Sequence, residues 1–200
     1  MKDLVMGKNP YKNFYQLQSD KGEGIHYRIC VTRRESSVAI IAPHGGGIEM
    51  GTSRIASAIA GKSYNLYCFE GLQSSSNNQL HITSSNFDEP QCLDLISKCE
   101  TVVSVHGLRG EHQAIEVGGL DKLLGNRMQT NLQMNGFQIS TPSFGKEGVE
   151  PNNICNRGLR QKGVQLEITK ALRDNLVADE LQLMTFVKAI SQALISDYHA

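Results

Sequence analysis

Three residues that could take part in acid–base or metal chemistry follow short apolar runs of the chain. His44, His106 and Glu167 each come at or directly after such a run. In open α/β sheets, catalytic groups gather at the carboxyl ends of the strands. We therefore expect these three side chains to meet at one edge of a sheet.

A fourth candidate, Glu49, is separated from His44 by three glycines and an isoleucine. Glycine adopts backbone angles closed to other residues, so this segment can turn back and bring Glu49 beside His44. Two imidazoles and a carboxylate are a common ligand set of catalytic zinc, with the fourth position left to water. Such a metal lowers the pKa of bound water toward about 7 and polarises a carbonyl. Glu167, a carboxylate on an apolar strand, is the candidate general base.

The His-Gly-Gly-Gly segment is also compatible, by spacing alone, with two different kinds of site. It resembles a phosphate-binding nest or the oxyanion turn of lipases. The chain has no G-x-S-x-G nucleophile motif, and a phosphate nest does not account for Glu49, which would repel an anion. Glu49 also suits the start of a helix, where an acidic side chain is favourable. H-x-x-x-x-E is a weaker pattern than H-E-x-x-H, so the zinc site is a hypothesis at this point.

The remaining histidines have polar neighbours. We expect His26, His81 and His199 at the surface. His112 lies six residues beyond His106 in a glycine-containing loop, and we weigh a substrate or catalytic contact against a solvated position.

A basic segment at 156–162 precedes the strand that carries Glu167. Arginine binds carboxylates through two parallel hydrogen bonds, so this segment is a candidate for gripping an acidic substrate. Arg157 and Arg109 stand beside glycines that let a loop turn inward, and both are candidate substrate contacts. Arg160 is a further candidate, for which a solvated loop is equally favoured.

Segments with strand and helix patterns alternate along the chain. The expected strands are 26–33, 37–42, 65–69, 80–83, 101–105, 114–117, 137–140 and 164–168. The expected helices are 54–60, behind Thr52 and Ser53 as N-caps, then 89–98, 120–134 and 178–198. This alternation predicts an α/β fold with an open mixed β-sheet flanked by helices.

Length and composition bound the class of protein. A chain of 200 residues suits one domain, 1–200, and nothing demands more than a monomer. Twenty basic and 20 acidic residues cancel, which argues against nucleic-acid binding, and the apolar runs are too short to span a membrane. Five cysteines without C-x-x-C spacing indicate reduced thiols. Residues 1–10 lack a signal-peptide pattern, so we expect a cytoplasmic location.

Several separate motifs resemble one known family, the poly-γ-glutamate hydrolases of Bacillus phages and their bacterial relatives. The matching segments are 42–52 (APHGGGIEMGT), 80–90, 105–110, 117–121, 156–158 and 163–168. They run in order across about residues 37–175, which makes the resemblance more specific than a single glycine loop.

The resemblance implies a zinc (Zn2+) amidohydrolase with a fold similar to that of zinc carboxypeptidases. By position, His44, Glu49 and His106 would be the metal ligands and Glu167 the general base. The implied substrate is poly-γ-glutamate, an acidic polymer, with endo-cleavage the more natural mode. If the protein is phage-encoded, lysis of the host would release it to that polymer.

One departure separates this chain from carboxypeptidases, which use H-x-x-E where four residues stand between His44 and Glu49 here. The clan's substrate tyrosine and arginines cannot be placed on this chain. Two alternatives are therefore kept: a zinc amidase that acts on cell-wall or other acidic peptides, and a binding protein without catalysis.

Overall fold

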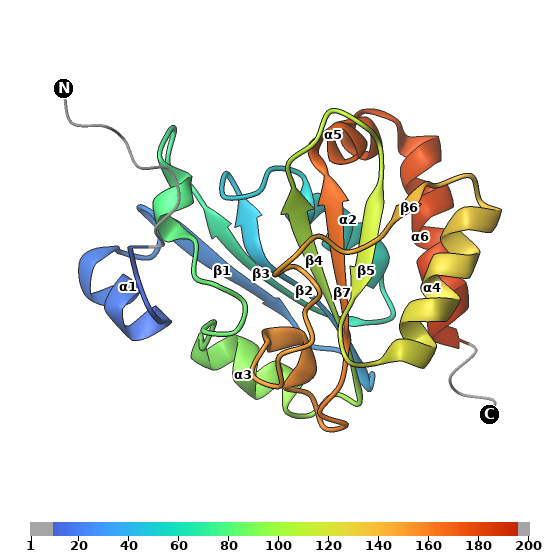
Figure 1. The fold of residues 1–200 in the computed structure, drawn as a ribbon. Helices are drawn as coiled ribbons and strands as arrows, with labels where there is room; N and C mark the ends of the chain where they lie inside the picture. The colour runs from blue at the N-terminus through green and yellow to red at the C-terminus, as the bar shows by residue number, and fades with distance from the viewer. Residues whose placement is uncertain (1–9, 196–200) are drawn as a thin grey trace.

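The strands of the protein form one mixed sheet with helices on both faces, seen in a computed structural model that describes residues 10–195 (Figure 1). Its seven strands lie in the order β1-β3-β2-β4-β7-β5-β6. They are β1 (Tyr27–Thr32), β2 (Val38–Gly46), β3 (Asn65–Gly71), β4 (Thr101–Leu108), β5 (Ile115–Gly118), β6 (Ile139–Ser140) and β7 (Val164–Thr169). The central strands β3, β2, β4 and β7 are parallel, whereas β1 and β5 run antiparallel to β3 and β7.

The helices cover the two faces of this sheet unequally. They are α1 (Phe14–Asp20), α2 (Thr52–Ala60), α3 (Pro90–Ile96), α4 (Lys122–Met134), α5 (Lys170–Ala178) and α6 (Glu180–Ile195), with short 3-10 helices at Asn77–Leu80 and Ile154–Asn156. Helices α2, α4, α5 and α6 pack on one face, and α1 and α3 pack on the other. Ile40 and Ile41, adjacent on β2, point into the two opposite cores. Burial on both faces explains why the central strands read as continuous apolar runs.

The strand order reverses between β2 and β4, and this places an opening at the carboxyl ends of these strands. From β2 the chain passes through α2 to β3 on one side, and from β3 through α3 to β4 on the other. The pairing of β2 with β4 ends at Ile41 and Ser104, so the two strands separate beyond these residues. Such a reversal is where open α/β sheets bind their ligands.

The expected α/β fold with a mixed sheet is confirmed, but two local predictions are wrong and one helix was missed. Segment 80–83 is not a strand, because Leu80 ends a 3-10 helix and Leu80 and Ile82 insert into the core beside α3. The helix expected at 178–198 is present as α6 from Glu180, where the Asp179 carboxylate accepts hydrogen bonds from the N–H groups of Leu181 and Gln182. The separate helix α5 before it was not expected. Residues 196–198 lie outside the described part of the chain.

The third correction concerns the start of α2. Its N-cap is Gly51, and no side chain caps the helix there. Thr52 is instead the first helical residue, and its hydroxyl donates to the carbonyl oxygens of Glu49 and His44, at 2.8 and 3.2 Å. The residue expected to cap the helix therefore closes the turn between two candidate ligands.

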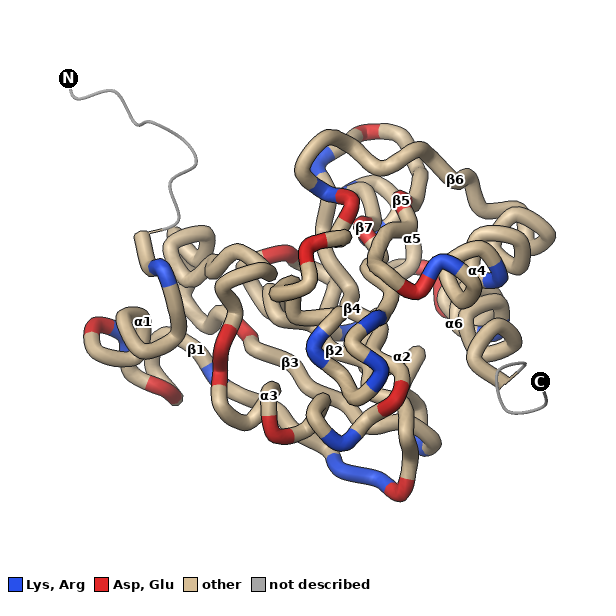
Figure 2. The backbone as a smooth tube through the Cα atoms, turned by 60° about the horizontal axis from the view of Figure 1, so that its bottom comes forward, with Lys and Arg blue, Asp and Glu red and all other residues tan. Residues whose placement is uncertain are grey.

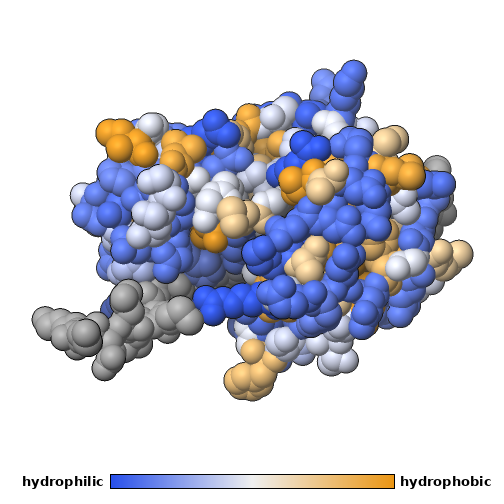
Figure 3. Space-filling view, turned by 90° about the horizontal axis from the view of Figure 1, so that it is seen from above, coloured by the Kyte–Doolittle hydropathy of each residue, from blue (hydrophilic) through white to orange (hydrophobic). Residues whose placement is uncertain are grey.

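Charged and apolar residues are dispersed over the outside of the molecule. Figure 2 shows basic and acidic positions interspersed along the backbone. The face above the carboxyl ends of the parallel strands is mainly hydrophilic, with hydrophobic residues in small separate groups (Figure 3). Among residues 10–195, no helix combines the length and the apolar character that crossing a membrane requires.

The turn from β2 to α2 depends on Gly46. This residue has φ of 60°, in the left-handed region, and a Cβ at this position would lie 2.5 Å from the carbonyl oxygen of Gly71. The turn then brings the Glu49 N–H to within 3.0 Å of the His44 carbonyl oxygen, where it donates a hydrogen bond. A larger residue at 46 would therefore force β2 and β3 apart just below the candidate ligands.

We expect Gly46→Ala to lower the free energy of unfolding by about 2–3 kcal/mol, because it adds a steric clash to an unfavourable backbone angle. Urea denaturation measures the loss. Gly136→Ala is the matched control, since Gly136 also has positive φ (85°) but no atom lies within 4 Å of the added Cβ. The control should lose only about 1 kcal/mol. Equal losses would show that the approach to Gly71 is unimportant.

Candidate active site

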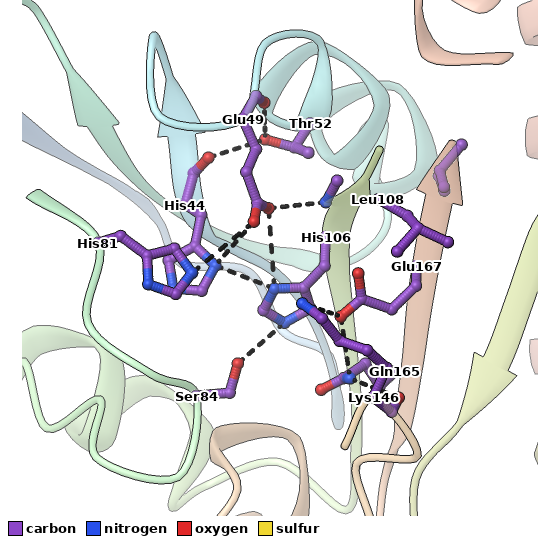
Figure 4. A network of polar contacts seen from close by, with 12 residues as sticks. His44, Glu49, Thr52, His81, Ser84, His106, Leu108, Lys146, Gln165 and Glu167 are labelled. Atoms are coloured by element: carbon purple, nitrogen blue, oxygen red, sulfur yellow. Dashed lines mark hydrogen bonds and ion pairs between the residues drawn. The ribbon is translucent and has the colours of Figure 1, made fainter. Parts of the chain in front are cut away.

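Three side chains converge at the opening between β2 and β4 (Figure 4). The Nδ1 atoms of His44 on β2 and His106 on β4 lie 3.1 Å apart. Glu49 reaches in from the β2–α2 turn, with one carboxylate oxygen 3.5 Å from His44 Nδ1 and the other 3.9 Å from His106 Nδ1. Their ligand atoms all lie within 4.8 Å of one another. The expected gathering of these three residues is thus present in the structure.

Hydrogen bonds hold each of the three groups from behind. His44 Nε2 donates to the carbonyl oxygen of Ile82 at 2.7 Å, which leaves the lone pair of the neutral ring on Nδ1. Ser84 Oγ lies 3.5 Å from Nε2 of His106. The N–H of Gly107 donates to Glu49 at 2.6 Å. Outer hydrogen bonds of this kind orient metal ligands and fix their tautomers.

The electrostatics of the cluster favour a carboxylate and an uncharged His106. Burial alone would raise the pKa of Glu49, but the His44 and His106 imidazoles and the Gly107 N–H outweigh it and lower the pKa to about 2. Burial, followed by repulsion from His44, lowers the pKa of His106 to about 3. At neutral pH, His106 therefore keeps a lone pair for a ligand.

This donor set fits a zinc ion. At Zn–N distances of about 2.0–2.1 Å, two nitrogens of a tetrahedral site lie roughly 3.3 Å apart. The observed 3.1 Å between the imidazole nitrogens and 3.5 Å to the Glu49 oxygen are close to that spacing. Two imidazoles with one carboxylate are also the ligand set of several zinc hydrolases.

A second carboxylate, Glu167 on β7, lies in the same pocket. It is 3% exposed, and its Oε2 has no hydrogen-bond partner among residues 10–195. Its Oε1 lies 3.2 Å from Gln165 Nε2 and 3.6 Å from Lys146 Nζ. Burial raises the pKa of Glu167 to about 7, with Glu49 adding to the rise and Lys146 opposing it. A carboxylate with such a pKa can take and return a proton near neutral pH.

Glu116 on β5 shows the contrast with an ordinary buried carboxylate. It is the register partner of Glu167 on the neighbouring strand. The backbone N–H and the hydroxyl of Ser143 donate to its two oxygens, at 2.8 and 2.6 Å. Glu116 is therefore satisfied within the fold, whereas one buried oxygen of Glu167 has no hydrogen-bond partner among residues 10–195.

The pocket beside the cluster has a volume of about 100 Å³ and is lined mostly by polar groups. Besides His44, His106 and Glu167, its walls include Thr83, Ser84 and Ser85 from the segment before α3, and Lys146, Glu150 and Asn153 from the segment after β6. Neither segment was expected from the sequence to contribute to the site, and Lys146 is the cation that sequence reasoning missed.

His81 was also missed, because its polar neighbours suggested a surface position. Its ring instead stacks on His44, with centroids 3.9 Å apart, and its Nε2 lies 3.8 Å from Glu49. The nearby His44 imidazole and then burial lower the pKa of His81 to about 3. The signal was available, since 80–90 is one of the segments that resemble the family. His26 accepts a hydrogen bond from the Gly22 N–H near the surface, as expected, and His199 lies outside the described residues.

The candidate substrate contacts do not line this pocket. Arg109 and His112 are exposed on the loop after β4. Arg157 turns its guanidinium to the carbonyl oxygen of Phe87, at 3.2 Å. Arg160 reaches Asp121 at 3.5 Å. Glycines beside Arg157 and Arg109 did not turn these side chains toward the pocket, because other acceptors or solvent engage them.

A candidate metal-ligand set and a carboxylate with a raised pKa share one polar pocket, an arrangement suited to hydrolysis. The fold and the site thus define a hydrolase of the α/β class with a candidate metal centre. More particularly, the chain belongs to the poly-γ-glutamate hydrolase family, whose sequence model matches residues 11–190.

Two UPF0714 proteins of Bacillus subtilis are similar to most of the chain. The chain is 37% identical to YndL of Bacillus subtilis over 174 residues, or 86% of this chain and 68% of YndL. It is 39% identical to the SPbeta prophage-derived protein YoqZ of the same organism, over 84% of this chain and 62% of YoqZ. The chain thus spans about two thirds of the length of these two relatives.

Two solved structures share the fold closely. A bacteriophage poly-γ-glutamate hydrolase superimposes with a TM-score of 0.90 at 32% identity, over 96% of this chain and 99% of that one. A zinc-free apo form of YndL superimposes with a TM-score of 0.89 at 34% identity, over 96% of this chain and all of that one.

We expect Glu167→Gln to stabilise the metal-free protein at pH 8, because ionising Glu167 costs free energy in the folded state. The pKa of Glu167 is raised from 4.5 to about 7. The wild-type protein therefore loses stability as pH rises through this range, and it loses none below pH 4.5. At about 1.4 kcal/mol per pKa unit, the gain is on the order of 3 kcal/mol at pH 8 and absent near pH 4. Urea denaturation in the presence of a chelator measures it.

Glu116→Gln is the matched control for this effect. It removes a satisfied buried carboxylate and should destabilise the protein by about 1 kcal/mol. A Glu167→Gln variant that is no more stable than wild type at pH 8 would contradict the raised pKa.

Proposed function

We propose that this protein is a zinc-dependent amidohydrolase that cleaves the γ-glutamyl amide bonds of poly-γ-glutamate. The observation that carries the proposal is the convergence of three ligand atoms beside a buried carboxylate with an unpartnered oxygen. Membership of the poly-γ-glutamate hydrolase family supports the polymer as substrate. The zinc-free apo form of YndL supports zinc as the metal, by analogy with that relative.

His44, Glu49 and His106 would hold the ion through two imidazole nitrogens and one carboxylate oxygen. When bound, zinc supplies a Lewis acid that polarises the scissile carbonyl and lowers the pKa of water. Gly107 and Ile82 keep the ligands turned inward through their backbone hydrogen bonds.

Glu167 is the proposed general base and then the general acid. Its free Oε2 accepts a proton from the water that attacks the amide carbon. The same carboxyl group returns this proton to the leaving nitrogen, so that water is added across the C–N bond. Gln165, which donates to Oε1, holds the carboxylate in position for both transfers.

Lys146 is the proposed contact for negative charge on the substrate. Each γ-linked unit keeps a free α-carboxylate, and the one on the leaving side is bonded to the carbon next to the scissile nitrogen. Lys146 lines the pocket with 41% of its side chain exposed, 3.6 Å from Glu167. Its segment is anchored, since the Lys146 N–H donates to Ser143 and its carbonyl accepts from Gln165. An ammonium here is placed to pair with that carboxylate or with the developing oxyanion.

Endo-cleavage is the proposed mode of action. An enzyme that trims chain ends needs a group that grips a terminal carboxylate, and arginine suits that task. No arginine among residues 10–195 lines this pocket. The site thus offers a single ammonium for the α-carboxylate that every unit of the polymer carries.

The test is the size of poly-γ-glutamate during incubation with the purified protein. We expect rapid shortening of the polymer with little free glutamate, complete loss of activity in a chelator and recovery with zinc. Glu167→Gln should bind zinc normally yet lose at least about 10²–10⁴-fold in kcat. Cleavage of peptidoglycan fragments in place of the polymer would overturn the substrate, and full activity of Glu167→Gln would overturn the base.

We expect Lys146→Met to reduce kcat/KM for poly-γ-glutamate by about tenfold or more, because the substrate carboxylate loses its partner. Lys146→Arg should retain most of the activity. Arg109→Met, which removes an exposed cation outside the pocket, is the control and should change kcat/KM by less than about twofold. A larger effect of Arg109→Met than of Lys146→Met would place the polymer on the loop after β4 instead.

A further inference from the structure

Arg173 on α5 is a buried cation to which the proposed reaction assigns no role. Its side chain is 7% exposed, yet it does not line the pocket. Burying a guanidinium is costly unless its N–H groups are all engaged. Its Nε and Nη1 groups donate to backbone carbonyls at the ends of three segments that carry candidate site residues.

Each of these carbonyls lies within two residues of a candidate catalytic group. Arg173 Nε donates to the Met50 carbonyl oxygen at 2.7 Å, one residue after Glu49. Its Nη1 donates to Leu108, two residues after His106, at 3.0 Å, and to Ile168, one residue after Glu167. A single planar group thus connects the β2–α2 turn, the end of β4 and the end of β7.

Two glycines leave the room that this side chain occupies. A Cβ at Gly107 would lie 2.7 Å from Arg173 Cζ and 2.9 Å from Glu49 Cβ. A Cβ at Gly51 would lie 3.2 Å from Arg173 Cβ. The backbone at Gly51 and Gly107 therefore leaves space for the Arg173 side chain as well as for the candidate metal ligands.

Sheet pairing fixes the end of β4 relative to the end of β7 as far as Leu108 and Thr169, but it does not fix the β2–α2 turn relative to this pair. The pairing of β2 with β4 stops at Ile41 and Ser104, before either ligand histidine. Glu49 lies on a turn outside the sheet.

Lysine could not replace Arg173 in this role. It carries the same charge, but its compact ammonium does not reproduce the spread of donors in the planar guanidinium.

We propose that Arg173 is a positioning residue that sets the place of Glu49 relative to His106 and Glu167, and thereby the zinc affinity of the site. This inference rests on the proposed zinc site. It adds that the affinity depends on a side chain that touches neither the metal nor the substrate.

The test compares Arg173→Lys with Leu176→Ala, a cavity-forming change at a fully buried position on the same helix. Zinc affinity is measured by competition with a chromophoric chelator, and the site geometry by the absorption spectrum of the cobalt(II)-substituted protein. We expect Arg173→Lys to weaken zinc binding about 10–100-fold and to alter the cobalt spectrum. Leu176→Ala should lower the melting temperature but keep the wild-type affinity and spectrum.

Wild-type zinc affinity in a folded Arg173→Lys variant would overturn the inference, and absence of zinc binding by wild type would instead overturn the proposed function. If Arg173→Lys does not fold, the inference is tested instead by the hydrogen-exchange rate of the Arg173 Nε–H in the wild-type protein, with and without zinc. Zinc should slow this exchange about tenfold or more, and an unchanged rate would overturn the inference.

Discussion

The structure depends on bringing two imidazoles and two carboxylates together in a buried space. An isolated charge in such a place is costly, so each group must be hydrogen-bonded, uncharged or paired with an opposite charge. His44, His106 and Glu49 meet this requirement through backbone and side-chain hydrogen bonds from behind, with their free lone pairs facing one another. Glu167 meets it only in part, and its pKa rises as a result.

The parallel sheet is what makes this gathering possible. Strands β2, β4 and β7 are neighbours that run the same way, so their carboxyl ends open on one edge. The register places His106 directly beside Glu167, and the reversal of strand order separates β2 from β4 at that level. Stability and the proposed reactivity therefore oppose each other at this edge of the sheet. Glu167→Gln is expected to make the metal-free protein more stable and to lower kcat.

Much of the sheet and the ligand cluster was accessible to sequence reasoning because it follows from local pattern. Apolar runs that end in His44, His106 or Glu167 predict strands and a shared edge, and the glycines before Glu49 predict a turn. What remained inaccessible depends on contacts between distant segments. His81 enters the site because Leu80 and Ile82 insert into the core, and Lys146 enters because Gln165 holds its backbone. The local pattern of neither segment predicts these contacts, although the resemblance of 80–90 to the family marks the segment of His81.

The place of β7 has a consequence for how the protein is made. This strand comes late in the sequence, at Val164–Thr169, yet it lies between β4 and β5, which are synthesised much earlier. A chain emerging from the ribosome can bring His44 and His106 into reach while Glu167 is still being translated. Such long-range pairing is slow to form because the intervening loop must close first. The proposed general base is thus the last of the four site groups to be synthesised, and a chain that ends before β7 lacks a group that the proposed hydrolysis requires.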